Sequence, residues 1–305
     1  MATPNSDFDE VLTTTLRRHQ KEIADNVSNH NALYKRLKAK GQAKSYPGGH
    51  EIAIPLDFAE NNTYQRFSGL DTLNIGGSEV LTTATFPWKQ AAVHVVISGR
   101  ELRQNSGNRE TIANLLEARV KNAKRTAANN MSTDMYSDGT SSNQIGGIQN
   151  LIQDDGTGTV GGINSSTYTF WNNQFEEAAG TVSKSTIKKE MMDLWLKTIR
   201  GGDKTDLIVG STELYTLYWD ALSDLQRYAD ADEGKTGFNS LKFLEADVVF
   251  DSSDSGMPAT HMYFLNTDYI WCFHHPDANW EVAADKVPLQ QDAIVKPLLW
   301  MRNMA

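Results

Sequence analysis

The composition of this 305-residue chain, with 39% hydrophobic and 22% charged residues, is typical of a globular protein and excludes a disordered one. No apolar run approaches the ~18 residues that a membrane helix needs, so no membrane span is expected. A single cysteine, Cys272, excludes an intrachain disulfide framework and a cysteine-based zinc cluster. The net charge of −9 is uneven, because residues 1–136 carry 17 Lys and Arg against 14 Asp and Glu, and residues 137–305 carry 12 against 24. This division indicates two surfaces with different neighbours, or one half that is simply better solvated.

Residues 7–40 are predicted to form an amphipathic helix or a pair of helices. Apolar residues recur there every three or four positions, sometimes with a turn skipped: Phe8, Leu12, Leu16, Ile23, Val27, Leu33 or Tyr34, and Leu37. The segment ends in a basic run: Lys35, Arg36, Lys38, Lys40 and Lys44. Because the apolar stripe is narrow, this helix is expected to pack either on its own domain or on a neighbouring chain.

Two strands that contain proline are predicted next, over residues 50–58 and 80–88. Pro55 and Pro87 restrict them to edge or exposed positions. No local helix follows that would cover them, so the pattern favours a projecting hairpin over a core sheet. Residues 91–97 are more apolar and indicate a strand that returns to the core.

The clearest helix is predicted over residues 109–136. Its apolar positions keep a spacing of three or four for about seven turns: Ile112, Leu115, Leu116, Val120, Ala123, Ala127, Met131 and Met135. The interpretation places four basic residues on the opposite side: Arg119, Lys121, Lys124 and Arg125. A helix this long is expected to act as a strut.

After a glycine-, serine- and threonine-rich irregular region at residues 137–167, helices and strands alternate. Helices are predicted over 187–199 and, with Ser211 as its cap, over 211–225. Strands are predicted over 206–210, 241–250, 261–265, 269–273 and 293–300.

The sequence matches known catalytic, cofactor-binding and metal-binding motifs only poorly. Residues 156–161 fit the letters of a dinucleotide-binding loop but lack the strand before and the helix after. His274 and His275 point to opposite faces of a strand, which is poor geometry for one metal ion. No nucleophile elbow or paired acid and base is present. No catalytic site, cofactor or metal is therefore expected.

Four stretches in order resemble a known family: residues 146–152, 160–164, 168–174 and 206–215. They are similar to stretches of tailed-bacteriophage major capsid (head) proteins of the Hong Kong 97 type. Their order and spacing, together with the elements above, extend the resemblance over nearly the whole chain.

The resemblance implies an α+β phage capsid fold in five parts. These are an N-terminal arm (1–45), an extended β-hairpin loop (46–92), a peripheral domain with the spine helix (93–139), a mixed α/β axial domain (140–258) and C-terminal strands that return to the peripheral domain (259–305).

The implied function is a major capsid protein that self-assembles into an icosahedral head around double-stranded DNA, in the virion and, during assembly, in the host cytoplasm. Its implied partners are copies of itself in hexamers and pentamers, a scaffolding protein, a portal and packaged DNA, with no membrane. The expected contacts between subunits are Phe8, Leu12, Leu16, Phe58, Tyr64, Phe86 and Trp88. The basic residues that could face DNA are Lys35, Arg36, Lys38, Arg119 and Lys124.

Two alternatives stay open at this point. One is an encapsulin-like shell of a bacterial nanocompartment, which has the same fold and binds enzyme cargo. The other is a soluble α+β enzyme with an unrecognised site, which a monomer with a deep pocket would support.

Overall fold

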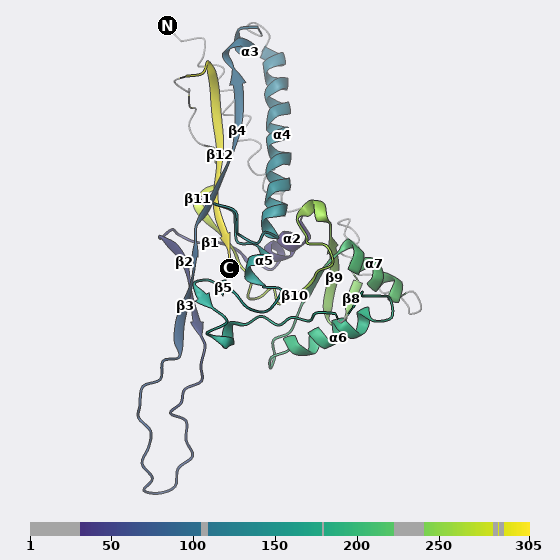
Figure 1. Ribbon diagram of the computed structural model, residues 1–305. Coiled ribbons are helices and arrows are strands. Elements are labelled where there is room, and N and C mark those ends of the chain that lie inside the picture. Colours follow the sequence, from purple (N-terminus) through teal and green to yellow (C-terminus); the bar gives the residue numbers. More distant parts are fainter. Residues whose placement is uncertain (1–30, 105–108, 179, 223–240, 283–285, 287–289) are drawn as a thin grey trace.

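The structure is a computed structural model that describes residues 31–104, 109–178, 180–222, 241–282, 286 and 290–305. Figure 1 shows three parts: a long sheet flanked by one long helix, a lobe with a second sheet, and a hairpin whose loop projects far from both.

The long sheet, here called the spine sheet, joins the two ends of the described chain. Its strands lie in the order β1 (Ala43–Ser45), β11 (Cys272–Val282), β12 (Ala293–Met304) and β4 (Lys89–Ser98). β1 runs parallel to β11, and the other pairs are antiparallel. β12 and β4 pair without interruption from Ala293 opposite Ser98 to Arg302 opposite Lys89.

A long helix, α4 (Arg109–Met135), follows the short α3 (Gly99–Gln104) and lies along the spine sheet (Figure 1). Its 27 residues span about 40 Å. Val120, Ala127 and Met131 are buried in the main core, with side chains of the sheet. The helix predicted over 109–136 is confirmed.

The first described helix, α2 (Ala32–Ala39), packs on the same core through Leu33 and Leu37, which are fully buried. Asn31 caps it by accepting a hydrogen bond from the Tyr34 backbone N–H at 2.8 Å. The Asn31 amide also donates to Ser132 of α4 at 3.2 Å. The cap thus attaches the start of α2 to the end of the spine helix.

Arg302 of β12 lies at the centre of this packing and is only 3% exposed. It lies within about 6 Å of three aromatic rings, those of Tyr34, Trp280 and Trp300. Its guanidinium also donates to Asn279 Oδ1 at 2.7 Å. One cation therefore joins α2, β11 and β12.

The second sheet has the strand order β10 (Met262–Leu265), β7 (Leu207–Ser211), β9 (Ala246–Asp251) and β8 (Leu241–Phe243). β7 is buried along its whole length, and α6 (Ile187–Thr198) and α7 (Thr212–Ala221) pack beside it. Ser211 caps α7 as expected, because its hydroxyl accepts from the Leu214 backbone N–H.

The strand predicted over residues 269–273 begins later and ends later than expected, and the strand predicted over 293–300 continues to Met304. β11 begins at Cys272 and continues through Pro276 to Val282. Its register with β12 shifts between His274 and Asn279. A bulge at this place accommodates the proline, which cannot donate a ladder hydrogen bond.

Candidate assembly surface

The projecting hairpin consists of β2 (Glu51–Asp57) and β3 (Leu81–Pro87), which pair over seven positions. Pro55 lies inside β2, opposite Thr83. A two-stranded ribbon has a free edge on each strand, so the proline interrupts no other ladder. The projecting hairpin predicted from the two prolines is therefore present (Figure 1).

Residues 58–80, here called the loop tip, connect the two strands and extend away from the body (Figure 1). Large apolar side chains are exposed in and beside it: Tyr64, Phe67, Leu70, Leu73, Ile75 and Leu81. Leu70 is fully exposed and Ile75 is 93% exposed. Apolar surface gathered in this way marks an interaction site, because water solvates it poorly.

Polar side chains hold the backbone of the loop tip. The Gln65 amide donates to the Thr72 carbonyl at 3.0 Å, and its oxygen accepts from the Asn74 backbone N–H at 3.0 Å. The Ser78 hydroxyl bonds to Asn62 across the neck of the loop. The loop is therefore shaped by its own hydrogen bonds, while its apolar side chains point to solvent.

The base of the hairpin is anchored in a small apolar cluster, here called the hairpin-base cluster: Ile52, Ala84, Phe86, Val160, Ile163 and Phe273. β5 (Thr159–Val160) and β6 (Ile163–Asn164) contribute two of its members. Thr85 N–H donates to the Gly161 carbonyl between them at 2.9 Å.

The expected contact residues fall into different environments. Phe86 is only 5% exposed and buried in its own chain, so its assignment to a contact between subunits is corrected. Trp88 is half-buried at the hairpin base, where its indole N–H donates to the Gly49 carbonyl at 3.1 Å. Phe58 stacks on Phe170 with ring centroids 5.0 Å apart, and Tyr64 is exposed on the loop tip. Phe8, Leu12 and Leu16 lie outside the described residues.

The sequence reasoning found only Tyr64 among the exposed apolar residues of the loop tip. It missed Phe67, Leu70, Leu73 and Ile75, because they follow neither a helical nor a strand period. The available signal was their position: apolar residues between two strands that contain proline and have no helix to cover them.

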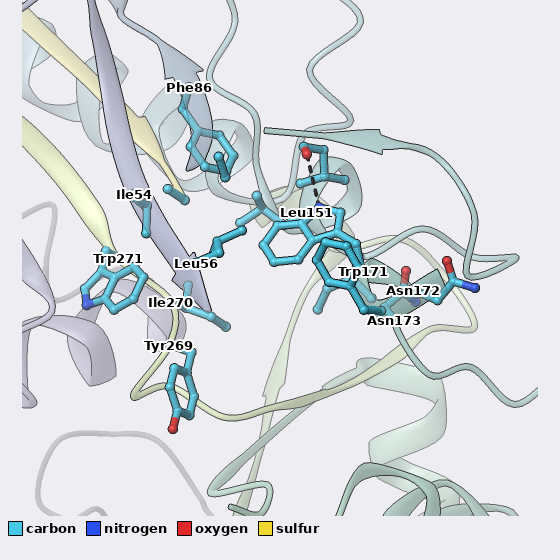
Figure 2. A pocket seen from close by; sticks show the side chains of 15 residues that line it. Ile54, Leu56, Phe86, Leu151, Trp171, Asn172, Asn173, Tyr269, Ile270 and Trp271 are labelled. Carbon is cyan, nitrogen blue, oxygen red and sulfur yellow. Dashed lines mark hydrogen bonds between the residues drawn. The ribbon is translucent and has the colours of Figure 1, made fainter. Parts of the chain in front are cut away.

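A groove of ≈ 410 Å³, here called the hairpin-base groove, opens beside the hairpin. Figure 2 shows its apolar walls, which come from β2 and β3, from α5 (Ile148–Leu151), from η1 (Thr169–Trp171) and from the segment before β11. The Trp171 indole N–H donates to the Val160 carbonyl at 3.1 Å and fixes one wall. Tyr269 and Ile270 line another wall.

The basic end of α2 is neutralised by carboxylates near the second sheet. Lys40 Nζ lies 2.8 Å from Asp206 and 2.9 Å from Asp268, and Arg36 lies 3.2 Å from Asp247. Burial opposes the charge of Asp206, but hydrogen bonds from Lys40 and Thr267 outweigh it and lower its pKa. Burial likewise opposes the charge of Lys40, yet its bonds to the carboxylates raise its pKa.

Of the remaining basic candidates, Lys124 is only 8% exposed, so its assignment to a DNA-facing surface is corrected. It lies one helical turn from both Val120 and Ala128, on the buried stripe of α4. Arg119 pairs with Glu101, and this bond lowers the pKa of the Glu101 carboxyl.

Four further basic side chains lie on α2 and α4. Lys38 is exposed at the end of α2, and Lys35 is half-buried on the same helix. Lys121 and Arg125 are exposed on α4, so they present positive charge on the outer face of the spine helix.

Arrangements for catalysis or metal binding were sought in the described part of the chain. There, no three His, Cys, Asp or Glu side chains gather in a way that could hold a metal ion. Residues 156–161 contain bends, the whole two-residue strand β5 and a turn, so they do not form a strand-to-helix phosphate loop. In the same ranges no helix is long and apolar enough to cross a membrane.

Comparison with known proteins identifies the fold. Neither a family model nor a curated protein matches the sequence. A chain of the cyanophage A-1(L) capsid asymmetric unit is similar in structure, with a TM-score of 0.59 at 13% identity over 89% of this chain and 88% of that one. A chain of Mycobacterium phage Cain has a TM-score of 0.51 at 11% identity, covering 87% and 82% of the two chains. A chain of Mycobacterium phage Adephagia has a TM-score of 0.50 at 12% identity, covering 87% of this chain and 81% of that one.

These likenesses cover 81% or more of each chain, so they extend over the mixed helix and sheet architecture of the whole fold and not over one part of it. The fold implied by the sequence resemblance is thereby confirmed. The chain has the capsid fold of tailed bacteriophages, of the Hong Kong 97 type.

Proposed function

We propose that this chain is a major capsid protein that self-assembles into the icosahedral head of a tailed bacteriophage, enclosing double-stranded DNA. The loop tip carries the proposal: its large apolar side chains project from the body, and no part of the described chain covers them, so another copy is the surface on which we expect them to be buried. The role is structural rather than enzymatic.

In this proposal the contacts between copies are heterologous, because the loop tip of one copy meets a different surface on the next. Heterologous contacts close into rings when the rotation allows it, which suits hexamers and pentamers. The spine sheet with α4 would form the peripheral domain, and the second sheet with α6 and α7 the axial domain. β10 lies in the second sheet, so it would belong to the axial domain and not to the C-terminal part (259–305) that the resemblance returns to the peripheral domain. A scaffolding protein, a portal and packaged DNA complete the proposed partners, in the virion and in the host cytoplasm during assembly.

Negative-stain microscopy of the purified protein, alone and with a co-expressed scaffolding protein, tests the proposal. Closed shells, tubes, or rings of five and six copies are expected. Uniform monomers under both conditions would overturn it. Nothing described above favours the encapsulin-like alternative, and shells that copurify with an enzyme cargo instead of DNA would favour it.

A further inference from the structure

The hairpin-base groove is apolar and is left open by the described part of the chain. Its walls combine the rings of Phe170, Trp171 and Trp271 with aliphatic side chains such as Leu56 and Ile270 (Figure 2). At ≈ 410 Å³ it has the size of a site that takes several side chains. Covering such a surface is favourable, because apolar area is removed from water.

Residues 1–30 of the chain lie outside the described residues and contain a segment that matches this groove. Phe8, Leu12 and Leu16 are four positions apart, which places them on one face of the helix that the sequence predicts. Grooves that bind amphipathic helices take side chains at this spacing.

The described chain begins close enough to the groove for this segment to reach it. Asn31 caps α2, whose eight residues span about 12 Å. At the other end of α2, Lys40 contacts Asp268, which directly precedes the groove residue Tyr269. Thirty residues in helical form extend about 45 Å.

The charges beside the groove and beside Phe8 also favour binding of the N-terminal segment in the hairpin-base groove. Lys44 is exposed beside the groove, with its ammonium group 5.3 Å from the centre of the Trp271 ring. Asp7, Asp9 and Glu10 stand next to Phe8 in the sequence. A helix that inserts Phe8 near Trp271 would bring these carboxylates toward the Lys44 ammonium group.

We infer that the apolar stripe Phe8, Leu12 and Leu16 of the N-terminal segment binds in the hairpin-base groove. The inference deepens the proposed function, because it gives the arm a defined docking site in place of a general contact between copies. The groove then serves as the receptor that positions the arm.

Cysteine pairing tests this in the full-length chain. Leu12→Cys is combined with Asn172→Cys, a groove position whose side-chain oxygen has no hydrogen-bond partner among the described residues. The native Cys272 is 2% exposed, and burial raises the pKa of its thiol, so it does not compete for the disulfide. The matched control is Thr14→Cys with Asn172→Cys, because position 14 lies about 200° around a helix from position 12.

Under mild oxidation the Leu12 pair is expected to cross-link at least tenfold more than the Thr14 pair. A shifted monomer band places the segment on its own copy and a dimer ladder places it on a neighbouring one, and either supports the inference. Equal cross-linking of both pairs, or none, overturns it. Cross-linking of Ile75→Cys to Asn172→Cys in place of the Leu12 pair also overturns it, because the loop tip would then fill the groove.

A second measurement avoids new disulfides. Hydrogen exchange at residues 168–173 is expected to quicken severalfold in Leu12→Gln and to stay unchanged in Thr14→Gln; unchanged exchange in both overturns the inference. Micrographs of the same samples separate the two proposals. Shells without the Leu12 cross-link overturn the docking alone, whereas absence of shells from the unsubstituted protein overturns the proposed function.

Discussion

Lys40 at the end of α2 and Asp206 just before β7 lie 2.8 Å apart, although 166 positions separate them in the sequence. This ion pair connects the C-terminal end of α2, which packs in the main core, to the start of β7, a buried strand of the second sheet. Asp206 also accepts hydrogen bonds of 2.7 Å from both the backbone N–H and the hydroxyl of Thr267. The Asp206 carboxylate therefore keeps its two hydrogen bonds from Thr267 when the lysine is removed.

Lys40→Met is expected to lower the free energy of unfolding by about 1 kcal/mol at neutral pH, since the pair is only partly shielded from water. The pKa of Asp206 is lowered, so the stabilisation is lost as pH falls below the ordinary value of 3.8. The pKa of Lys40 is raised, so it is also lost as pH rises above 10.5. Urea titrations should give a constant difference from wild type between about pH 5 and 9. A difference that varies within that window would contradict this account.

The contribution of Asp251 to stability is expected to change with pH in the opposite direction to that of Asp206. Burial raises its pKa above 3.8, although Ser255, Tyr136 and the Ser252 backbone N–H donate hydrogen bonds to it. Between 3.8 and the raised value the folded chain binds more protons than the unfolded chain, so this group adds stability as pH falls. The stability of wild type relative to Asp251→Asn should therefore increase from neutral pH toward pH 4. Asp254→Asn, which changes an exposed neighbour, is the matched control.

Phe86→Ala is expected to destabilise the unassembled chain by about 3 kcal/mol, because it empties a position in the hairpin-base cluster. Its thermal transition should fall by several degrees. Leu70→Ser is the matched surface change: Leu70 is fully exposed, so the transition should stay the same while shell formation is impaired. Calorimetry and microscopy on both variants check the pair. A normal transition in Phe86→Ala would return that residue to the contacts between subunits.

Gly161→Ala is expected to weaken the same cluster. The residue has φ +59°, and an added Cβ would lie 2.8 Å from the Ala84 Cβ and 3.0 Å from the Phe86 ring. Gly162→Ala meets the same left-handed backbone strain at φ +78°, but its nearest neighbour, the Thr85 hydroxyl, is 3.5 Å away. The difference between the two variants, about 1–3 kcal/mol in urea titrations, measures the clash alone. Equal losses would show that backbone strain accounts for both.

The elements of the fold were predictable where the pattern is local and periodic. α4 follows from apolar positions that keep one face for seven turns, and α7 follows from its serine cap and the buried strand before it. The hairpin follows from a different local fact: Pro55 and Pro87 exclude its strands from the interior of a sheet.

The surfaces depend on contacts that no local pattern reveals. Lys124 was assigned to the polar side of α4 because of its charge, yet its spacing from Val120 and Ala128 puts it on the buried stripe. The hairpin-base groove is lined by segments that are far apart in the sequence, so no single stretch of sequence predicts it. The bulge that carries β11 past Pro276 is likewise set by its pairing with β12.

The outer face of α4 gives the last prediction. Lys121 and Arg125 are exposed one turn apart, and phosphates attract such side chains without sequence preference. If this face contacts packaged DNA, the double variant Lys121→Glu and Arg125→Glu should bind duplex DNA more weakly. The slope of log affinity against log salt should also fall by roughly 2, since each phosphate contact contributes about 0.9. Lys189→Glu on α6, whose side chain is 75% exposed, is the control and should leave both the affinity and the slope unchanged. Equal affinity and slope in the double variant and wild type would assign the DNA-facing surface to another part of the chain.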